Sequence, residues 1–300
     1  MTLPIVHHPD YVAQTPEGHR FPMAKFGRLA ARLAADGLAP GGFHAPEPAP
    51  RDLLLQAHGQ AYVDAVLDQR VERAVERRIG LPITASVARR AQLATAGTLL
   101  TARLALTHGA AANTAGGSHH AARDAGAGFC VFNDVAVAAL ALLADGAVRR
   151  VLVVDLDVHH GDGTALLFQA DPRVFTFSMH CEANWPLEKP ASDLDVAVPP
   201  GAGDDAYLAL LAAHLPRALA QARPDLVFYN AGVDVHADDR LGKLALTDAG
   251  IAARDAMVAQ CCRQAGVPVA GVIGGGYQDD LEALAYRHSL LHRALAASPA

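Results

Sequence analysis

The chain alternates helix-like segments with short apolar runs. Five segments rich in alanine and leucine favour helices, and several begin near an Asp, Asn or Thr that can cap a helix. These predicted helices cover residues 28–38, 88–107, 134–143, 204–222 and 247–265. Runs of strand length that are rich in β-branched residues lie between them, at 151–156, 173–179, 225–230 and 267–273, and a further short run lies at 110–114.

The predicted strands are apolar along their whole length instead of alternating between polar and apolar residues, which is typical of parallel strands buried on both faces. Strands that alternate with helices predict an α/β fold with a doubly wound parallel sheet. We find no internal repeat and expect one domain over residues 1–300. The stretches 37–50 and 187–205, rich in Pro, Gly and charged residues, are expected to be loops, with one short strand at 196–198.

Composition narrows the class of protein. Of the 300 residues, 51% are hydrophobic, which supplies a large core and excludes a disordered chain. The net charge of −6 argues against nucleic acid as a partner. We find no apolar run near the roughly 20 residues of a membrane helix, and no signal-peptide pattern at the N-terminus. The four cysteines form no C-x-x-C motif, so we expect a soluble protein of the reducing cytoplasm.

Polar side chains gather where the predicted strands end. In open parallel sheets, ligands bind beyond the carboxyl ends of the strands. Four strand ends carry most of the polar residues that can do chemistry, namely His119 and His120, then Asp155, Asp157, His159, His160 and Asp162, then Asp234, then Tyr277. This distribution predicts a functional site at one edge of the sheet.

The strand that ends near Asp155 predicts a metal site. Side chains alternate in an extended segment, so Asp155, Asp157 and His159 share one side of it. Two carboxylates and an imidazole at a buried strand end are unfavourable unless a cation binds them. The simplest assignment is one divalent metal on Asp157, His159 and Asp234, with open positions for water and substrate. Each residue could instead be a helix cap or a satisfied buried polar group, but the matching groups on other strands favour a site.

A metal-activated water also needs a base that takes its proton and returns it to the leaving group. His119 and His120 follow two glycines at a strand end, and Asp155 and Asp162 are natural orienting carboxylates for them. Three glycines precede Tyr277 and would let the backbone turn sharply, so that its phenol could donate a hydrogen bond to a developing oxyanion. The alternative for Tyr277 is an ordinary buried tyrosine.

Five motifs resemble the histone deacetylase superfamily in their order and spacing. They are Gly-Gly-Ser-His-His at 116–120 with Gly-Phe-Cys at 128–130, Asp-Leu-Asp-Val-His-His-Gly-Asp at 155–162, Ser-Met-His at 178–180, Asn-Ala-Gly-Val-Asp at 230–234 and Gly-Gly-Gly-Tyr at 274–277. The segments around Tyr229 and Asp239 look most like the class IV, histone deacetylase 11-like branch and its bacterial relatives. The resemblance implies the arginase/deacetylase fold, a single α/β domain around an eight-stranded parallel sheet with helices on both faces.

The resemblance also implies roles for single residues. Zinc would bind Asp157, His159 and Asp234, although iron(II) suits the same ligands. His120, paired with Asp162, would be the general base and then the acid, and His119, paired with Asp155, would orient the water. Tyr277 would polarise the amide carbonyl. Four residues would contact the substrate, namely Gly128 through its backbone, Phe129 and Trp185 as walls of an acyl-lysine tunnel, and Leu241 near its mouth.

Two potassium sites are implied as well. The first, beside the zinc, maps onto the Asp155 and Ser178 side chains and the backbones of Asp157, His159 and Met179. The second, outer site maps onto the backbones of Phe168, Asp171 and Val174.

The sequence leaves the substrate open. The resemblance implies a metal-dependent hydrolase of acylated lysine in proteins or of small acylated amines, and the class IV likeness adds long acyl chains. Ser118 replaces a common aromatic residue, and the segment 81–90 lacks the rim acid that grips a peptide in class I enzymes. An acidic residue at the tunnel mouth would favour acetylpolyamines, and Asp238, Asp239 and Glu182 are candidates for it.

Two further alternatives remain. An arginase-like enzyme with two manganese ions needs a carboxylate two positions after His159, where this chain has Gly161. A non-catalytic acyl-lysine binding protein would be expected to have lost a ligand or the tyrosine, and neither is lost.

Overall fold

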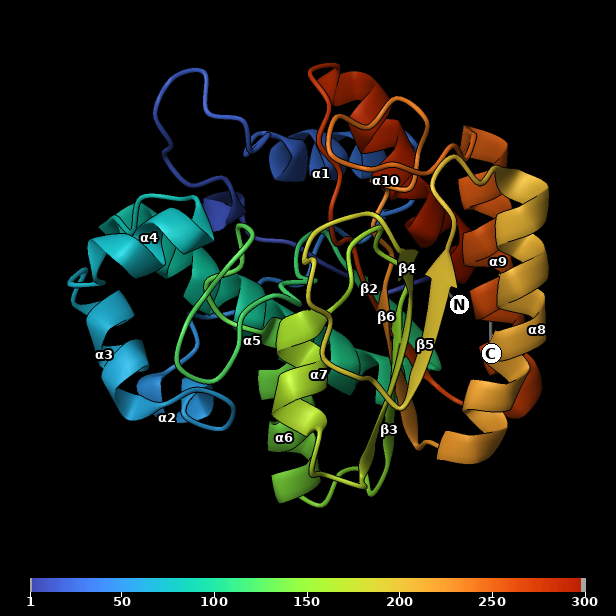
Figure 1. Ribbon diagram of the computed structural model, residues 1–300, viewed down its shortest axis with the longest axis horizontal. Coiled ribbons are helices and arrows are strands. Elements are labelled where there is room, and N and C mark those ends of the chain that lie inside the picture. Colours follow the sequence, from blue (N-terminus) through green and yellow to red (C-terminus); the bar gives the residue numbers. More distant parts are fainter. Residues whose placement is uncertain (1, 298–300) are drawn as a thin grey trace.

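The computed structural model describes residues 2–297, which form a parallel sheet with helices on both faces (Figure 1). Within these residues the sheet has seven strands in the order β1-β2-β7-β6-β3-β4-β5, and every neighbouring pair is parallel. The strands are β1 (Ile5–Val6), β2 (Ala110–Asn113), β3 (Val151–Asp155), β4 (Val174–Cys181), β5 (Leu194–Val198), β6 (Leu226–Asn230) and β7 (Val269–Val272). The predicted α/β class with a doubly wound parallel sheet is therefore confirmed.

Helices cover the two faces of this sheet unequally. Figure 1 shows α8, α9 and α10, in orange and red, on one side of the strands, and the green helices α6 and α7 on the other, with α2, α3 and α4 further out. The helices are α1 (Lys25–Ala35), α2 (Arg51–Leu54), α3 (Gln60–Leu67), α4 (Arg73–Ile79), α5 (Ala85–His108), α6 (Asp134–Ala144), α7 (Asp162–Phe168), α8 (Asp204–Ala222), α9 (Asp248–Ala265) and α10 (Leu281–Ala296), with a short 3₁₀ turn at Pro9–Tyr11.

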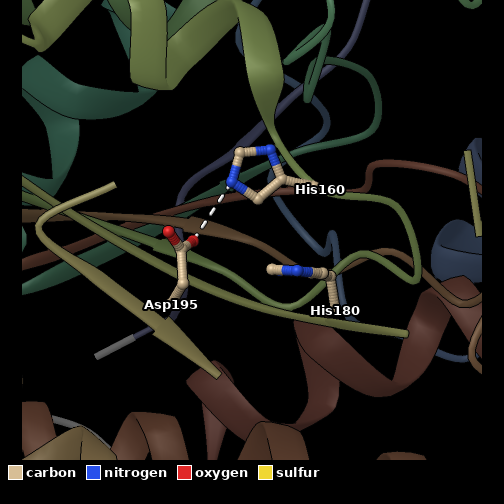
Figure 2. Close-up of side chains that lie close together, drawn as sticks. All are labelled: His160, His180 and Asp195. Atoms are coloured by element: carbon tan, nitrogen blue, oxygen red, sulfur yellow. Dashed lines mark hydrogen bonds and ion pairs between the residues drawn. The ribbon is translucent and has the colours of Figure 1, made fainter. Parts of the chain in front are cut away.

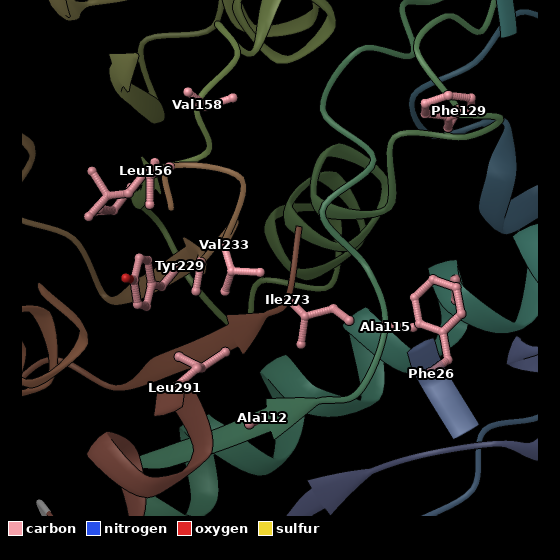
Figure 3. Packing of buried hydrophobic residues seen from close by; sticks show 14 of the residues in the cluster. Phe26, Ala112, Ala115, Phe129, Leu156, Val158, Tyr229, Val233, Ile273 and Leu291 are labelled. Carbon is pink, nitrogen blue, oxygen red and sulfur yellow. The ribbon is translucent and has the colours of Figure 1, made fainter. Parts of the chain in front are cut away.

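Alternate residues of the central strands contact two different hydrophobic clusters. On β3, Leu152 and Val154 belong to the larger cluster, part of which Figure 3 shows, whereas Val151 and Val153 belong to the smaller one beneath α6. Burial on both faces explains why these strands read as uninterrupted apolar runs in the sequence.

The sheet has one strand fewer than the eight that the family resemblance implied. The segment at His44 lies beside β1, but it pairs through one parallel bridge, Val6 with His44, and two backbone hydrogen bonds. Prolines at positions 46, 48 and 50 follow it closely. Proline has no N–H to donate to a ladder, so the pairing stops before a strand can form.

Most predicted elements occur close to their expected positions. The predicted helix at 204–222 coincides with α8, and the expected short strand at 196–198 is part of β5. The C-terminal helix α10 was not predicted. Its buried face includes Arg287, His288 and His292, so the apolar periodicity that marks a helix in a sequence is interrupted there. The ends of the expected 1–300 domain lie outside the described residues.

Among residues 2–297, the structure contains no helix long and apolar enough to cross a membrane.

The packing of α10 on the sheet generates the first prediction. Leu291 is buried and lies against Gly271 of β7. We expect Leu291→Ala to lower the free energy of unfolding by about 2–5 kcal/mol because it leaves a cavity, as measured by urea denaturation. The control Leu187→Ala removes a side chain that is 87% exposed, and we expect a change below about 0.5 kcal/mol. Equal effects of the two substitutions would contradict this packing.

Candidate active site

The site lies at the carboxyl ends of the three central strands. Strand β3 ends at Asp155, which pairs in register with Asn230 at the end of β6 and with Ser178 on β4. Strand β7 leads directly into the glycine-rich segment before Tyr277. Parallel pairing therefore brings together polar residues that are far apart in the sequence.

The predicted metal ligands Asp157, His159 and Asp234 come together. Their ligand atoms lie within 4.8 Å of one another, and all three residues are buried. The Nδ1 atom of His159 lies 3.1 Å from Asp157 Oδ1 and 3.1 Å from Asp234 Oδ2. One imidazole nitrogen and two carboxylate oxygens thus face a common point. These three atoms are a suitable donor set for a divalent metal with open positions for other ligands.

The charges within this cluster favour a positive charge between the carboxylates. Burial and the negative charge of Asp157 raise the pKa of Asp234 to about 7. Burial lowers the pKa of His159, but its hydrogen bonds to Asp157 and Asp234 outweigh that effect and raise it to about 10. The two carboxylates therefore favour the positively charged form of the His159 imidazole. A divalent cation would meet the same demand.

The backbone fits closely around the two carboxylates. Gly275 N–H donates to Asp157 Oδ2 at 2.7 Å, and Val158 N–H donates to Asp234 Oδ1 at 3.0 Å. A Cβ at Gly275 would lie 2.1 Å from Asp234 Oδ2 and 2.7 Å from Asp157 Oδ2. Only glycine leaves this space open, so the residues present suit a metal ion.

Each histidine of the predicted pair has its own carboxylate. His119 Nδ1 lies 2.7 Å from Asp155 Oδ2, and His120 Nδ1 lies 2.6 Å from Asp162 Oδ1, at the first residue of α7. The loop that carries both histidines is held by Asp134, which accepts from the backbone N–H groups of Gly117 and Ser118. Because Nδ1 of His120 contacts Asp162, its other ring nitrogen, Nε2, is available on the side of the cavity that this residue lines.

The two histidines differ in charge. Burial and the neighbouring His119 lower the pKa of His120 to about 3, although Asp162 opposes this. Burial also lowers the pKa of His119, but Asp155 and Asp157 outweigh it and raise the value to about 9. These shifts favour the neutral form of His120, which leaves a lone pair on its free ring nitrogen, and the protonated form of His119.

Tyr277 faces the same pocket from a loop with several anchors. Its backbone N–H donates to Asp239 Oδ2 at 2.7 Å, and the buried ammonium of Lys25 donates to the carbonyl of Gly274 at 3.1 Å. Burial and the charges of Asp157 and Asp234 raise the pKa of the Tyr277 phenol well above its usual value. The phenol therefore keeps its proton and can donate it in a hydrogen bond.

A cavity of about 500 Å³ joins these groups to the surface. The predicted substrate contacts line it, namely Gly128, Phe129, Trp185 and Leu241. The ring of Trp185 lies 4.6 Å from that of His120, centroid to centroid, and that of Phe129 lies 5.6 Å from that of Tyr277. Phe129 has a φ of 65°, an uncommon conformation for a residue with a side chain, which reflects the tight turn after Gly128.

The residues of the two predicted potassium sites lie apart from each other. Asp155 and Ser178 are paired in register on β3 and β4, next to the cluster of Asp157 and His159. The residues of the outer site, Phe168, Asp171 and Val174, belong to the turn between α7 and β4, where the N–H groups of Asp171 and Val174 donate to Phe168 O and Asp171 O. Potassium at both sites stays a prediction.

A second group of potential metal ligands lies nearby (Figure 2). The ligand atoms of His160, His180 and Asp195 also fall within 4.8 Å of one another. His160 Nε2 already lies 3.1 Å from Asp195 Oδ1, and His180 Nδ1 lies 3.0 Å from Ser178 Oγ. These contacts link the loop after β3 to strand β5, and we interpret the group as a structural one.

Three supporting residues were not predicted. Asn230 donates to Asp155 Oδ1 at 3.0 Å, Asp239 accepts from three backbone N–H groups around Tyr277, and Lys25 holds the glycine-rich loop. The position of Asn230 at a strand end could have indicated its role. Lys25 gave no local signal, because its partners lie about 250 positions away in the chain.

Comparisons with known proteins show the family and the fold of this chain. The family model of the histone deacetylase domain matches residues 19–292. An uncharacterized protein of Picosynechococcus sp. is 53% identical over 98% of both chains, and histone deacetylase 2 of Arabidopsis thaliana is 31% identical over 86% of this chain and 70% of its own. The crystal structure of the HDA15 HD domain, at 24% identity, matches with a TM-score of 0.80 over 97% of this chain and 90% of that one, which shows the same fold.

The two ligand groups generate a prediction about metal content. We expect the purified protein to bind one equivalent of zinc, and Asp234→Asn to lose it because one of the two carboxylates is removed. The matched variant Asp195→Asn should keep one equivalent, since it alters only the second group. Atomic absorption after dialysis measures both. Loss of zinc in Asp195→Asn alone would contradict the assignment.

Proposed function

The chain belongs to the histone deacetylase family of amide hydrolases, and we propose that it removes acetyl or longer acyl groups from lysine side chains or related primary amines in a metal-dependent reaction. One observation carries this proposal. One cavity of about 500 Å³ is lined by His159, which belongs to the cluster with Asp157 and Asp234, by His120, which is paired with Asp162, and by Tyr277.

Asp157, His159 and Asp234 would hold the metal, which we take to be zinc, with iron(II) as the alternative for the same ligands. A metal held by these residues would polarise a carbonyl oxygen and make a water molecule acidic near neutral pH. Asp155 and Ser178 would hold potassium, which would add a further positive charge near the carboxylates of the site. A cytoplasmic location completes the proposal, in keeping with the four free cysteines.

The two histidines would divide the proton transfers. His120 is neutral and its Nε2 faces the cavity, so it can take a proton from the attacking water and later give one to the leaving amine. Asp162 holds the ring through Nδ1 and stabilises the imidazolium that forms. His119, whose protonated form Asp155 favours, would orient the water and support the negative charge of the transition state.

The remaining residues would hold the substrate. The Tyr277 phenol donates a hydrogen bond to the scissile carbonyl as its oxygen becomes negative. The carbonyl of Gly128 accepts from the amide N–H of the substrate, while the rings of Phe129 and Trp185 enclose the methylene chain. Leu241 contacts the substrate nearer the mouth.

Two other functions fit the geometry of the site less well. An arginase-like second metal would need a carboxylate at position 161, where a Cβ would lie 2.5 Å from Asp155 Oδ2, so the site has no room for a side chain there. A binding protein without activity would not need two buried histidine–aspartate pairs beside the cavity. We therefore favour the hydrolase.

A substrate panel tests the proposal directly. We expect the zinc-loaded protein to release the acyl group from at least one of the acetyl, butyryl, octanoyl and myristoyl lysine peptides or acetylpolyamines. Mass spectrometry of the products gives both the activity and the preferred acyl length. A zinc-loaded protein that hydrolyses none of them would contradict the proposed function.

We expect Tyr277→Phe to lower kcat by about two to three orders of magnitude, the usual effect of removing one oxyanion donor. The metal content should not change, because the phenol is not a ligand. Tyr286→Phe, which changes a half-buried tyrosine on α10, is the matched control and should retain normal turnover. Steady-state kinetics that show near-normal kcat for Tyr277→Phe would refute the role of the phenol.

His120→Ala should abolish turnover while zinc stays bound at one equivalent, since His120 is a base and not a ligand. The control His108→Ala removes an exposed histidine at the end of α5 and should affect neither property. Turnover and metal content are measured on the same preparation. If His120→Ala lost its metal, the residue would be a ligand and the assignment would be wrong.

A further inference from the structure

We propose that the mouth of this cavity recognises a carboxylate on the amine side of the scissile amide. The preferred substrates are then acylated amines that carry negative charge, and not cationic polyamines. This inference rests on the proposed function and names the substrate class of the same site.

Three cationic side chains line the cavity at its opening. Arg20, Arg78 and Lys243 are exposed, whereas His120, His159 and Tyr277 lie buried at the inner end. None of the residues that line this cavity is an Asp or a Glu. The opening is therefore locally positive, although the whole chain has a net charge of −6.

These cations have no carboxylate of their own. Among residues 2–297, no Asp or Glu oxygen lies within 4.0 Å of the side-chain nitrogens of Arg20, Arg78 or Lys243. The neighbouring Arg240, by contrast, pairs with Asp279 at 2.6 Å. The charge at the mouth thus stays available to a ligand.

Two of the three cations are held in place. The guanidinium of Arg20 lies 5.0 Å from the centroid of the Phe129 ring, which is one wall of the cavity. The ammonium of Lys243 donates to Ala183 O at 2.7 Å, and its backbone N–H donates to Asn184 Oδ1 at 3.1 Å. Anchored charges lose less conformational freedom on binding and contribute more to recognition.

Two of the three acidic residues that could have bound a polyamine make other contacts. Asp239 directs its carboxylate to the backbone N–H groups of Leu241, Gly242 and Tyr277, and Asp238 pairs with Arg287 at 2.9 Å. The residues that line the cavity do not include Asp238, Asp239 or Glu182. Among the residues that line the cavity, a cationic amine would meet three like charges and no counter-charge.

The position of the cations defines which part of the substrate they meet. The acyl group must reach His120, His159 and Tyr277 at the inner end, so the amine-bearing part of the substrate lies at the opening. The carboxylate therefore belongs to that part. It can be the free carboxylate of an acylated diamino acid or an acidic side chain next to an acyl-lysine in a peptide.

Matched substrates separate these sources. The first pair is Nα-blocked Nε-acetyl-lysine with a free carboxylate and the same molecule as its carboxamide. The second pair is an acetyl-lysine peptide with flanking Asp residues and the same peptide with Asn. We expect the charged member of at least one pair to have a kcat/KM about three- to tenfold higher at low salt, with the ratio falling as salt is added. The pair with the larger ratio identifies the source.

Variants test whether the mouth causes the preference. Arg78→Gln and Lys243→Gln should each reduce the ratio between charged and neutral substrates, by about two- to fivefold. Arg77→Gln removes an exposed cation from the same helix α4 that does not line the cavity, and should leave the ratio unchanged. A ratio of one in the wild type, or a ratio that survives both variants, would overturn the inference.

Binding decides the question independently of turnover. The inactive His120→Ala variant should bind the carboxylate form more tightly than the carboxamide in a calorimetric titration. Absence of hydrolysis by the wild type would contradict the proposed function, whereas equal binding of the two forms would contradict the recognition of a carboxylate.

Discussion

The site depends on two buried carboxylates that face each other. Asp157 lies in the segment that follows β3, and Asp234 lies in the segment that follows β6. Both carboxylates contact His159, and both residues are buried from water. Such an arrangement is unfavourable unless positive charge is placed between the carboxylates. The glycine at position 275, two histidine–aspartate pairs and an open cavity lie close to these carboxylates.

The fold supplies this arrangement through strand order. Strands β7, β6 and β3 are neighbours, so their carboxyl ends bring Tyr277, Asp234 and Asp157 to one edge of the sheet. Arg254 of α9, fully buried, donates to the carbonyls of Leu156 and Gly232 and thereby fixes the segments after β3 and β6. The candidate metal ligands therefore lie on short segments that directly follow strands and that Arg254 holds through hydrogen bonds.

Much of the sheet and of the candidate site could be predicted because its signals are local. Apolar runs mark β3 and β6, and the polar residues follow directly in the sequence. Other features depend on contacts between distant segments. Lys25 donates to Gly274 O, and Asp239 accepts from the Tyr277 N–H. No periodicity in the sequence predicts either contact. The basic mouth of the cavity likewise brings together Arg20, Arg78 and Lys243 from three segments that lie far apart in the sequence. The expected eighth strand does not form, because prolines follow the bridge at His44.

Anomalous X-ray scattering at the zinc edge, on crystals of the zinc-loaded protein, tests the central claim most directly. The account predicts one strong peak between Asp157 Oδ, His159 Nδ1 and Asp234 Oδ, at bonding distances of about 2.0–2.2 Å from each. A peak between His160, His180 and Asp195 instead, or no peak at either group, would contradict it.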